Sequence, residues 1–219
     1  WVFFQVRFRG RACHSGCKQE GVSAIDKAMK VIQALNEKEH EWLLEYKHPL
    51  LPAPNLNVGV IQGGTAGSTV PEECMFQTCV HFVPGIMSMK QVIQEFTDTV
   101  NRTAKADVWM EQHMPEITIY QTGNGFEMDP EDPFVKTFRN AYRTVFGREV
   151  PIVGSPSGCD SRLWRNIAKC PTIQYGPGEL AQCHALNECL DLEEYWQSIL
   201  VYAQLILDWG SKPGTQQTA

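Results

Sequence analysis

The sequence Val2-Phe3-Phe4-Gln5-Val6-Arg7-Phe8 decides the fold of the first half of the chain. From Phe3 to Phe8, Phe and Val alternate with Gln and Arg, and this period of two is typical of a strand with one buried face. Gly10 ends the strand, because glycine breaks a regular strand pattern. The stretch therefore predicts a half-buried strand, and the segments that follow it show what kind of sheet it joins.

Two helical and three further strand patterns follow. The predicted elements are, in order, a helix burying Val22, Ile25, Met29, Ile32 and Leu35, strands at 56–61 and 75–83, a helix capped by Ser88, and a strand at 107–112. The order strand, helix, strand, strand, helix, strand is that of a split βαβ, ferredoxin-like unit. We therefore predict a four-stranded antiparallel sheet with both helices on one face.

The second half of the chain alternates differently. A stretch rich in Gly and Pro at 115–133 predicts a domain boundary. The elements expected after it are helices at 133–147, 160–168 and 192–209, with short strands at 150–153 and 172–175. Strands that alternate with helices favour parallel packing, in which the loops after the strands gather the chemistry. The two loops in question are 154–160 and 176–188.

Composition excludes several classes of protein. The net charge of -6 and the absence of a Lys/Arg-rich run argue against a nucleic-acid partner. No apolar run reaches the roughly 18 residues that span a bilayer, so we expect a soluble, cytoplasmic protein that needs no membrane. The eight Cys are expected to be free thiols, since a core of this size does not need disulfides. The chain starts at Trp1 with no initiator Met, which suggests the middle of a longer protein.

The strongest local signal is the loop from Tyr175 to Glu188, which presents His184 after an expected strand. Such a loop can aim an imidazole at a metal. Taken by itself, the loop is better explained as a surface histidine beside a helix N-terminus. Three other motifs change that weighing: Gly10-Arg11-Ala12-Cys13-His14-Ser15-Gly16, Gly63-Gly64-Thr65-Ala66-Gly67-Ser68-Thr69-Val70-Pro71-Glu72, and Ser157-Gly158-Cys159-Asp160-Ser161-Arg162.

In this order, the four motifs resemble the family of zinc-dependent aminoacylases, acetylornithine deacetylases, succinyl-diaminopimelate desuccinylases and carboxypeptidase G-like metallopeptidases. The resemblance runs from Phe3 to about Trp209. It implies a catalytic α/β domain with two divalent metal ions, zinc or alternatively cobalt or manganese, interrupted by a lid domain that forms a homodimer. On this reading 1–117 is the lid, 118–210 is the C-terminal portion of the catalytic domain, and 211–219 is a tail.

The resemblance also implies roles for single residues. His184 matches the family's C-terminal metal ligand, and His14 matches the lid histidine that stabilises the oxyanion in the partner subunit's site. Substrate-binding positions fall on Ser68, His81, Asp160, Arg162 and Gly178. Many relatives carry Asn and Arg where this chain has Ser68 and His81, so the implied substrate is left open. For Asp160 and Arg162, helix capping and an ion pair are equally good structural alternatives.

The family's remaining ligands and its catalytic base come from a segment with His-x-Asp, a bridging Asp and a Glu-Glu pair, and none of these precedes Trp1. A catalytic zinc ion needs about three protein ligands, so His184 alone cannot build the site. We expect the complete protein to hydrolyse an amide of an N-acyl amino acid or short peptide, and this chain to be an incomplete, inactive part of it.

Three rival readings are weighed against this expectation. The first is a non-catalytic dimerisation or binding module that keeps the fold. The second is an enzyme that uses Cys183 and His184, which is disfavoured because adjacent residues rarely face each other. The third is a metal clip at Cys13-His14-x-x-Cys17, which lacks a second ligand pair at zinc-finger spacing.

Overall fold

The computed structural model describes residues 1–211, which form two compact units. The first unit contains 1–125 together with 156–158, and the second contains the remaining residues. The last strand of the first unit, Glu116–Thr122, crosses the boundary expected after residue 117. Of the tail expected over 211–219, all but Ser211 lies outside the described residues.

The first unit is built on the sheet that the sequence predicts. Its strands are β1 (Val2–Arg9), β3 (Asn55–Gly63), β5 (Glu73–His81) and β6 (Glu116–Thr122), in the order β3-β5-β1-β6. All three pairings are antiparallel. The two central strands, β1 and β5, pair from Val2 opposite Val80 to Arg9 opposite Glu73. The predicted fold class is confirmed: a mixed α/β chain with a four-stranded antiparallel sheet.

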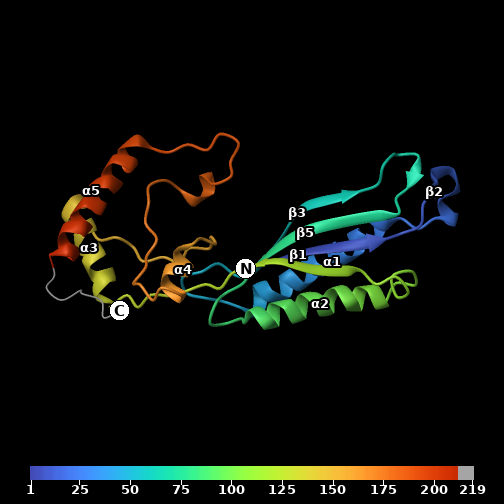
Figure 1. Cartoon of the computed structure of the whole chain (residues 1–219), viewed down its shortest axis with the longest axis horizontal. Coiled ribbons are helices and arrows are strands. Elements are labelled where there is room, and N and C mark those ends of the chain that lie inside the picture. Colours follow the sequence, from blue (N-terminus) through green and yellow to red (C-terminus); the bar gives the residue numbers. More distant parts are fainter. Residues whose placement is uncertain (212–219) are drawn as a thin grey trace. The chain divides into compact units, whose positions relative to one another are not determined.

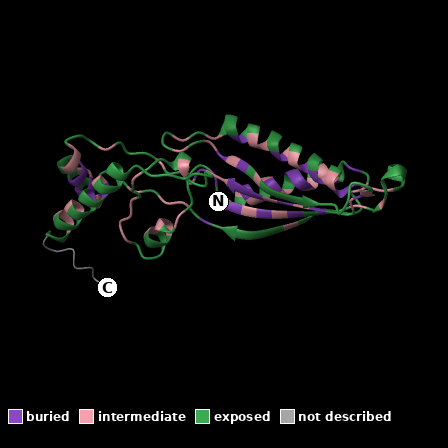
Figure 2. Ribbon diagram, turned by 90° about the horizontal axis from the view of Figure 1, so that it is seen from above, coloured by how far each residue is buried: buried purple, intermediate pink, exposed green. Residues whose placement is uncertain are grey.

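Two helices, α1 (Ala24–Glu45) and α2 (Met89–Lys105), cover one face of this sheet (Figure 1). The alternation of buried and exposed positions along the strands follows from that cover (Figure 2). Phe4 of β1 stacks on Phe96 of α2 with ring centroids 3.8 Å apart. The first helix is longer than its pattern predicts, because Trp42 is fully buried and its indole N–H donates to Glu95 of α2 at 2.5 Å.

A small second sheet extends the unit beyond the end of β1. It pairs β2 (Cys13–His14) with β4 (Thr69–Val70), and a 3-10 helix, η1 (Ser15–Glu20), follows directly. Figure 1 shows β2 at the opposite end of the first unit from the N-terminus. The sequence analysis missed both short strands, since two residues are too few to show a period.

The strand predicted over Asp107–Gln112 is wrong. This segment is a series of turns between α2 and β6. The buried Asp107 carboxylate accepts hydrogen bonds from the backbone N–H groups of Trp109 and Met110, both at 3.1 Å. A side chain that bonds its own backbone two residues ahead favours a turn over an extended strand.

The second unit contains α3 (Pro133–Phe146), α4 (Ser161–Asn166), η2 (Leu180–Gln182) and α5 (Leu192–Gly210). The helices expected at 133–147, 160–168 and 192–209 are therefore present. Phe138 and Tyr142 of α3 pack with Val201 of α5 to form a small core. No described helix is both long and apolar enough to cross a membrane.

The strands predicted at 150–153 and 172–175 are not formed in this structure. Both segments lack regular secondary structure, and neither belongs to either of the two sheets among the described residues. An extended segment becomes a strand only when a neighbour satisfies its backbone N–H and C=O groups. Among the described residues of this unit, no strand is paired with either segment.

Candidate functional site

His14 ends the short strand β2 at the far end of the first unit. Its side chain is exposed, and its Nδ1 accepts a hydrogen bond from the backbone N–H of Gly16 at 3.1 Å. A neutral imidazole that accepts at Nδ1 carries its proton on Nε2. In this tautomer the Nε2–H of His14 is the donor.

The structure brings Ser68 next to His14. The backbone N–H of Ser15 donates to the carbonyl oxygen of Ser68 at 2.8 Å, and His14 pairs with Thr69 in the small sheet. Two of the candidate residues, 54 positions apart in the chain, therefore share one exposed end of the first unit. Ser68 is exposed.

A close approach of backbones at Gly10 holds this end of the unit together. The N–H of Gly10 donates to the carbonyl of Glu72 at 2.7 Å. A Cβ at this position would lie 2.1 Å from the carbonyl oxygen of Val22 and 2.8 Å from that of Pro71. Only glycine lets these three segments meet, so Gly10 positions the turn that carries Ser68 against the turn that carries His14.

His81 does not join this pair. It ends β5, next to Val80, which pairs with Val2 at the N-terminal end of β1. Glu73, at the other end of β5, pairs with Arg9 beside the His14 turn. Eight steps along a strand span about 26 Å, so one chain cannot apply His14 and His81 to the same small molecule. His81 is half-buried, and burial lowers the pKa of its imidazole, which favours the neutral ring.

The loop that carries His184 lies in the second unit. His184 is exposed and has a φ of 66°, one of two non-glycine residues with positive φ in the described chain. Its backbone N–H donates to the Glu188 carboxylate at 3.3 Å. A non-glycine residue in the left-handed region is uncommon.

Gly178 ties the same loop to α5. It has a φ of 88°, and its N–H donates to the Glu194 carboxylate at 3.0 Å. Its backbone conformation favours glycine, and a Cβ there would lie 3.0 Å from Leu190 Cδ1, so the leucine side chain would have to shift slightly. The role shown for Gly178 is conformational, while its predicted contact with substrate stays a prediction.

Asp160 and Arg162 lie at the start of α4. Asp160 occupies the N-cap position, but its side chain makes no capping hydrogen bond, and it is exposed. The capping alternative weighed for this residue is therefore wrong. Arg162 is half-buried in the first turn of the helix. The substrate-binding reading of both residues stays a prediction.

The described residues do not by themselves fit a catalytic metal site. Nowhere in residues 1–211 do three or more His, Cys, Asp or Glu side chains gather as a metal would require. A catalytic zinc ion takes about three protein ligands, and His184 offers one. The same finding weighs against the metal clip considered for Cys13, His14 and Cys17.

Every cysteine of the chain is free, as predicted. Burial raises the pKa of the Cys79 thiol to about 11, which keeps it protonated and unreactive. Cys183 is exposed and precedes His184 in the chain. Its backbone N–H donates to the carbonyl oxygen of Leu180. Nothing in this geometry favours the nucleophile reading of Cys183.

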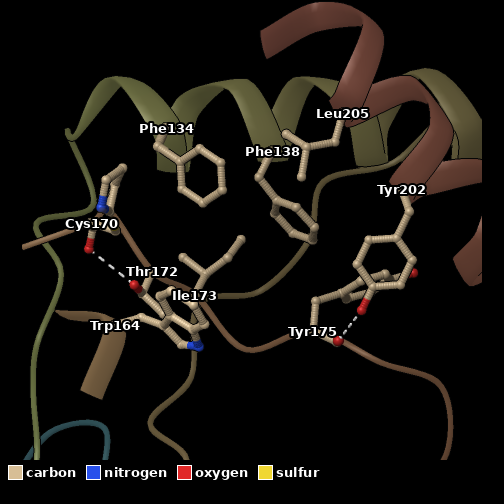
Figure 3. Close-up of a pocket in the computed structure, with 10 residues that line it drawn as sticks. Phe134, Phe138, Trp164, Cys170, Thr172, Ile173, Tyr175, Tyr202 and Leu205 are labelled. Carbon is tan, nitrogen blue, oxygen red and sulfur yellow. Dashed lines mark hydrogen bonds between the residues drawn. The ribbon is translucent and has the colours of Figure 1, made fainter. Parts of the chain in front are cut away.

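Sequence reasoning missed an apolar pocket of about 300 Å³ in the second unit. Figure 3 shows Phe134 and Phe138 projecting from α3, with Leu205 of α5 beside Phe138 and Tyr202 of α5 beside Tyr175. The Tyr202 hydroxyl donates to the carbonyl of Tyr175, and burial raises the pKa of both phenols. Tyr202 of α5 lines this pocket.

The chain is similar to several known proteins. Residues 2–108 match the peptidase dimerisation domain family. The chain is 31% identical to the N-formyl-4-amino-5-aminomethyl-2-methylpyrimidine deformylase of Bacillus subtilis, over 95% of this chain and 51% of the relative. It is 28% identical to the acetylornithine deacetylase of Vibrio atlanticus, over 86% of this chain and 47% of the relative. The chain thus spans about half the length of these curated relatives.

Among solved structures, an M20 family metallo-carboxypeptidase from Sulfolobus solfataricus superposes with a TM-score of 0.67. The superposition covers 94% of this chain and 57% of that one, at 15% identity. At this identity the likeness concerns the fold.

Proposed function

We propose that the chain supplies the dimerising lid and the C-terminal part of a metal-dependent amidohydrolase, a proposal supported by the match of residues 2–108 to the peptidase dimerisation domain of the M20 enzymes. The reaction is hydrolysis of an amide bond in a small N-acylated substrate. The relatives named above are a deformylase and a deacetylase, which both remove an acyl group from nitrogen. A zinc-type metal, bound in the complete protein with His184 as one ligand, belongs to this proposal.

The observation that carries the proposal is the fixed tautomer of His14. Hydrolysis of an amide places negative charge on the carbonyl oxygen only as the transition state forms. A donor already oriented toward that oxygen stabilises the charge without reorganising. The Gly16 N–H occupies His14 Nδ1, which leaves Nε2–H as the donor for the oxyanion.

The positions of His14 and His81 support a shared site in a homodimer. His81 ends β5 about 26 Å from Glu73, and Glu73 lies at the end of the unit that carries the His14 turn, so a site that uses both histidines draws them from two subunits. We propose that His14 acts in the partner's site, as the family resemblance implies. Neither the nucleophile nor the general base is among the residues assigned here.

The substrate-binding groups favour a substrate without a strong negative charge. Ser68 is uncharged, and burial favours the neutral form of His81. A neutral pair can hydrogen-bond a heteroaromatic amine or an amide but holds a carboxylate less well than arginine does. We propose that a short N-acyl or N-formyl amide is the substrate, with an N-acyl amino acid or short peptide as the broader class.

Mixed dimers of the complete enzyme test this proposal. His14→Ala and His184→Ala chains, each inactive in its own dimer, are combined in equal amounts. Random exchange puts half of the dimers in the mixed form, where one of two sites has both residues intact, so about a quarter of wild-type activity returns. A homodimer of either variant that keeps full activity, or a mixture that recovers none, would contradict the arrangement.

The rival function is a non-catalytic dimerisation module, and the same measurement addresses it. If the complete wild-type protein dimerises but hydrolyses neither N-formyl-4-amino-5-aminomethyl-2-methylpyrimidine nor N-acetylornithine nor a dipeptide, the module reading replaces the enzyme.

A further inference from the structure

Two cysteines flank His14, and the structure places them in contact. Cys13 pairs with Val70 in the small sheet, and Cys17 follows in the exposed helix η1. The sulfur of Cys13 donates to the backbone carbonyl oxygen of Cys17 at 3.3 Å. The turn that carries His14 therefore begins and ends at two thiols that lie beside each other.

The distance between these cysteines suits a disulfide. A carbonyl oxygen lies about 2.4 Å from the Cα of its own residue, so Cys13 Sγ lies within about 5.7 Å of Cys17 Cα. Two residues joined by a disulfide have Cα atoms that are typically about 5.5 to 6 Å apart, and their sulfurs bond at about 2 Å. A small shift of Cys17 thus brings its sulfur to that of Cys13.

Cys13 is anchored, whereas Cys17 lies in a segment that resists a shift only weakly. The sulfur of Cys13 occupies space beside Gly21, where an added Cβ would lie 2.5 Å from it. Cys17 is exposed, and its φ of -118° and ψ of 38° interrupt η1. No residue of that helix is buried. Segments with little buried surface open and rearrange at low cost in free energy.

We propose that Cys13 and Cys17 are a redox site that closes into a reversible disulfide and thereby controls His14. The oxidant is a low-molecular-weight disulfide such as glutathione disulfide. The exposed Cys17 thiolate attacks one of its sulfurs, forms a mixed disulfide and releases one glutathione. The Cys13 thiolate then attacks the Cys17 sulfur and releases the second glutathione. The two protein thiols are oxidised, glutathione disulfide is reduced, and the two thiol protons end on the released glutathiones.

Closure of this ring acts on the hydrogen bond that sets the His14 tautomer. Gly16, whose N–H donates to His14 Nδ1 at 3.1 Å, is the chain neighbour of Cys17. When Cys17 moves toward Cys13, Gly16 moves with it and this hydrogen bond is broken. The proton is then no longer fixed on Nε2. This control of His14 rests on the proposed function, whereas formation of the disulfide does not.

Peptide mapping tests the disulfide. The whole chain is equilibrated with glutathione and glutathione disulfide, blocked with iodoacetamide and cut with trypsin. Cleavage after Arg11 and Lys18 releases 12–18, which contains Cys13 and Cys17 and no other cysteine. The expected product is this peptide without label and lighter by two hydrogen atoms, and dithiothreitol should restore both thiols.

Single variants separate closure of the ring from simple thiol reactivity. In Cys13→Ser, the glutathione adduct on Cys17 should persist at least about tenfold longer than in wild type, because no neighbouring thiol displaces it. Cys183→Ser, at an exposed cysteine of the second unit, is the matched control. It should leave closure within 12–18 unchanged.

The complete enzyme tests the control of His14. Its kcat should fall at least about tenfold when mapping shows the disulfide, because the oxyanion donor is no longer fixed in place. Dithiothreitol should restore kcat. Cys17→Ser should keep the same kcat before and after treatment with glutathione disulfide.

Two results would overturn the redox site: a 12–18 peptide that carries only separate glutathione adducts or none, and one that is cross-linked to a second chain. Equal kcat in the two redox forms would remove the control of His14. If the peptide closes as described but the reduced complete enzyme hydrolyses no amide, the disulfide stands and the proposed function fails.

Discussion

The Nδ1 atom of His14 accepts a hydrogen bond from the backbone N–H of Gly16 at 3.1 Å. This contact lies within one turn, so it needs no ligand or partner to set the tautomer of the ring. It gives the exposed His14 a donor at Nε2.

His14→Gln in the complete enzyme should lower kcat about 10²-fold to 10³-fold, as removal of one oxyanion donor does elsewhere. Metal content should stay the same, because the residue stabilises charge on the substrate. Steady-state kinetics and metal analysis of one preparation check both points. His113→Gln, another exposed histidine of the first unit, is the control and should keep wild-type kcat. A His14 variant that loses metal would contradict the assignment.

His184→Ala in the complete enzyme should lower the amount of bound metal per chain. The reason is that a catalytic ion held by about three protein ligands loses much of its affinity when one is removed. Metal analysis after dialysis measures this directly. His40→Ala, an exposed histidine on α1, is the matched control. Unchanged metal stoichiometry in His184→Ala would exclude it as a ligand.

The pair Ser68→Asn and His81→Arg should shift substrate preference toward acylated amino acids that carry a free carboxylate. An arginine supplies a permanent charge and a fork of donors that matches a carboxylate, which a neutral imidazole does not. The ratio of kcat/KM for N-acetylornithine to that for N-formyl-4-amino-5-aminomethyl-2-methylpyrimidine should rise at least about tenfold. An unchanged ratio would mean that these positions do not contact the substrate.

Gly10→Ala should destabilise the first unit by about 2 kcal/mol or more, because the added methyl overpacks three converging backbones. The contact at 2.1 Å is to a carbonyl oxygen of the main chain and not to a flexible side chain. Urea unfolding of the chain measures the free energy of unfolding. Gly67→Ala, with nothing within 4 Å of its Cβ position, is the control and should change that free energy little. Equal stability of the two variants would show that the turns at Gly10 can separate freely.

Asp107→Asn should lower the free energy of unfolding by about 2 kcal/mol near pH 7, since Asp107 is a buried carboxylate bonded to charged donors. Lys27 Nζ lies 2.9 Å from both carboxylate oxygens, and Lys30 contacts one of them at 2.5 Å. Burial alone raises the pKa of Asp107, but the bonds from Lys30 and Lys27 and from the Met110 N–H outweigh it and hold the pKa well below its usual value.

The sign of the pH dependence follows from that shift. The folded state binds the Asp107 proton less readily than the unfolded state, whose pKa is about 3.9, so the stabilisation is complete above about pH 5. It is lost as the pH falls through 4 toward the folded value. The difference in unfolding free energy between wild type and Asp107→Asn should therefore shrink in acid. Asp98→Asn, at an exposed carboxylate bonded to Gln94, should show no such trend.

The family resemblance drawn from four motifs is confirmed, and so is the topology of the first unit. Both rest on local patterns. The alternation from Phe3 to Phe8 and the Ser88 cap, which accepts from Gln91 N–H at 3.1 Å, depend on residues a few positions apart. The strand predicted at Asp107 failed because the Asp107 carboxylate closes a turn with the N–H groups of Trp109 and Met110. The contact of the same carboxylate with Lys27, 80 positions away, appears in no local pattern.

By itself the sequence determined which residues to consider: His14, Ser68, His81 and His184 stand out within their motifs. Only the tertiary structure decided that Ser68 lies beside His14 while His81 lies at the far end of β5, because the pairing register of β1 and β5 is set by the buried core between them and the two helices. Tertiary structure also decided that the strands at 150–153 and 172–175 are not formed. Their residues favour extended chain, but a strand exists only where another backbone completes its hydrogen bonds.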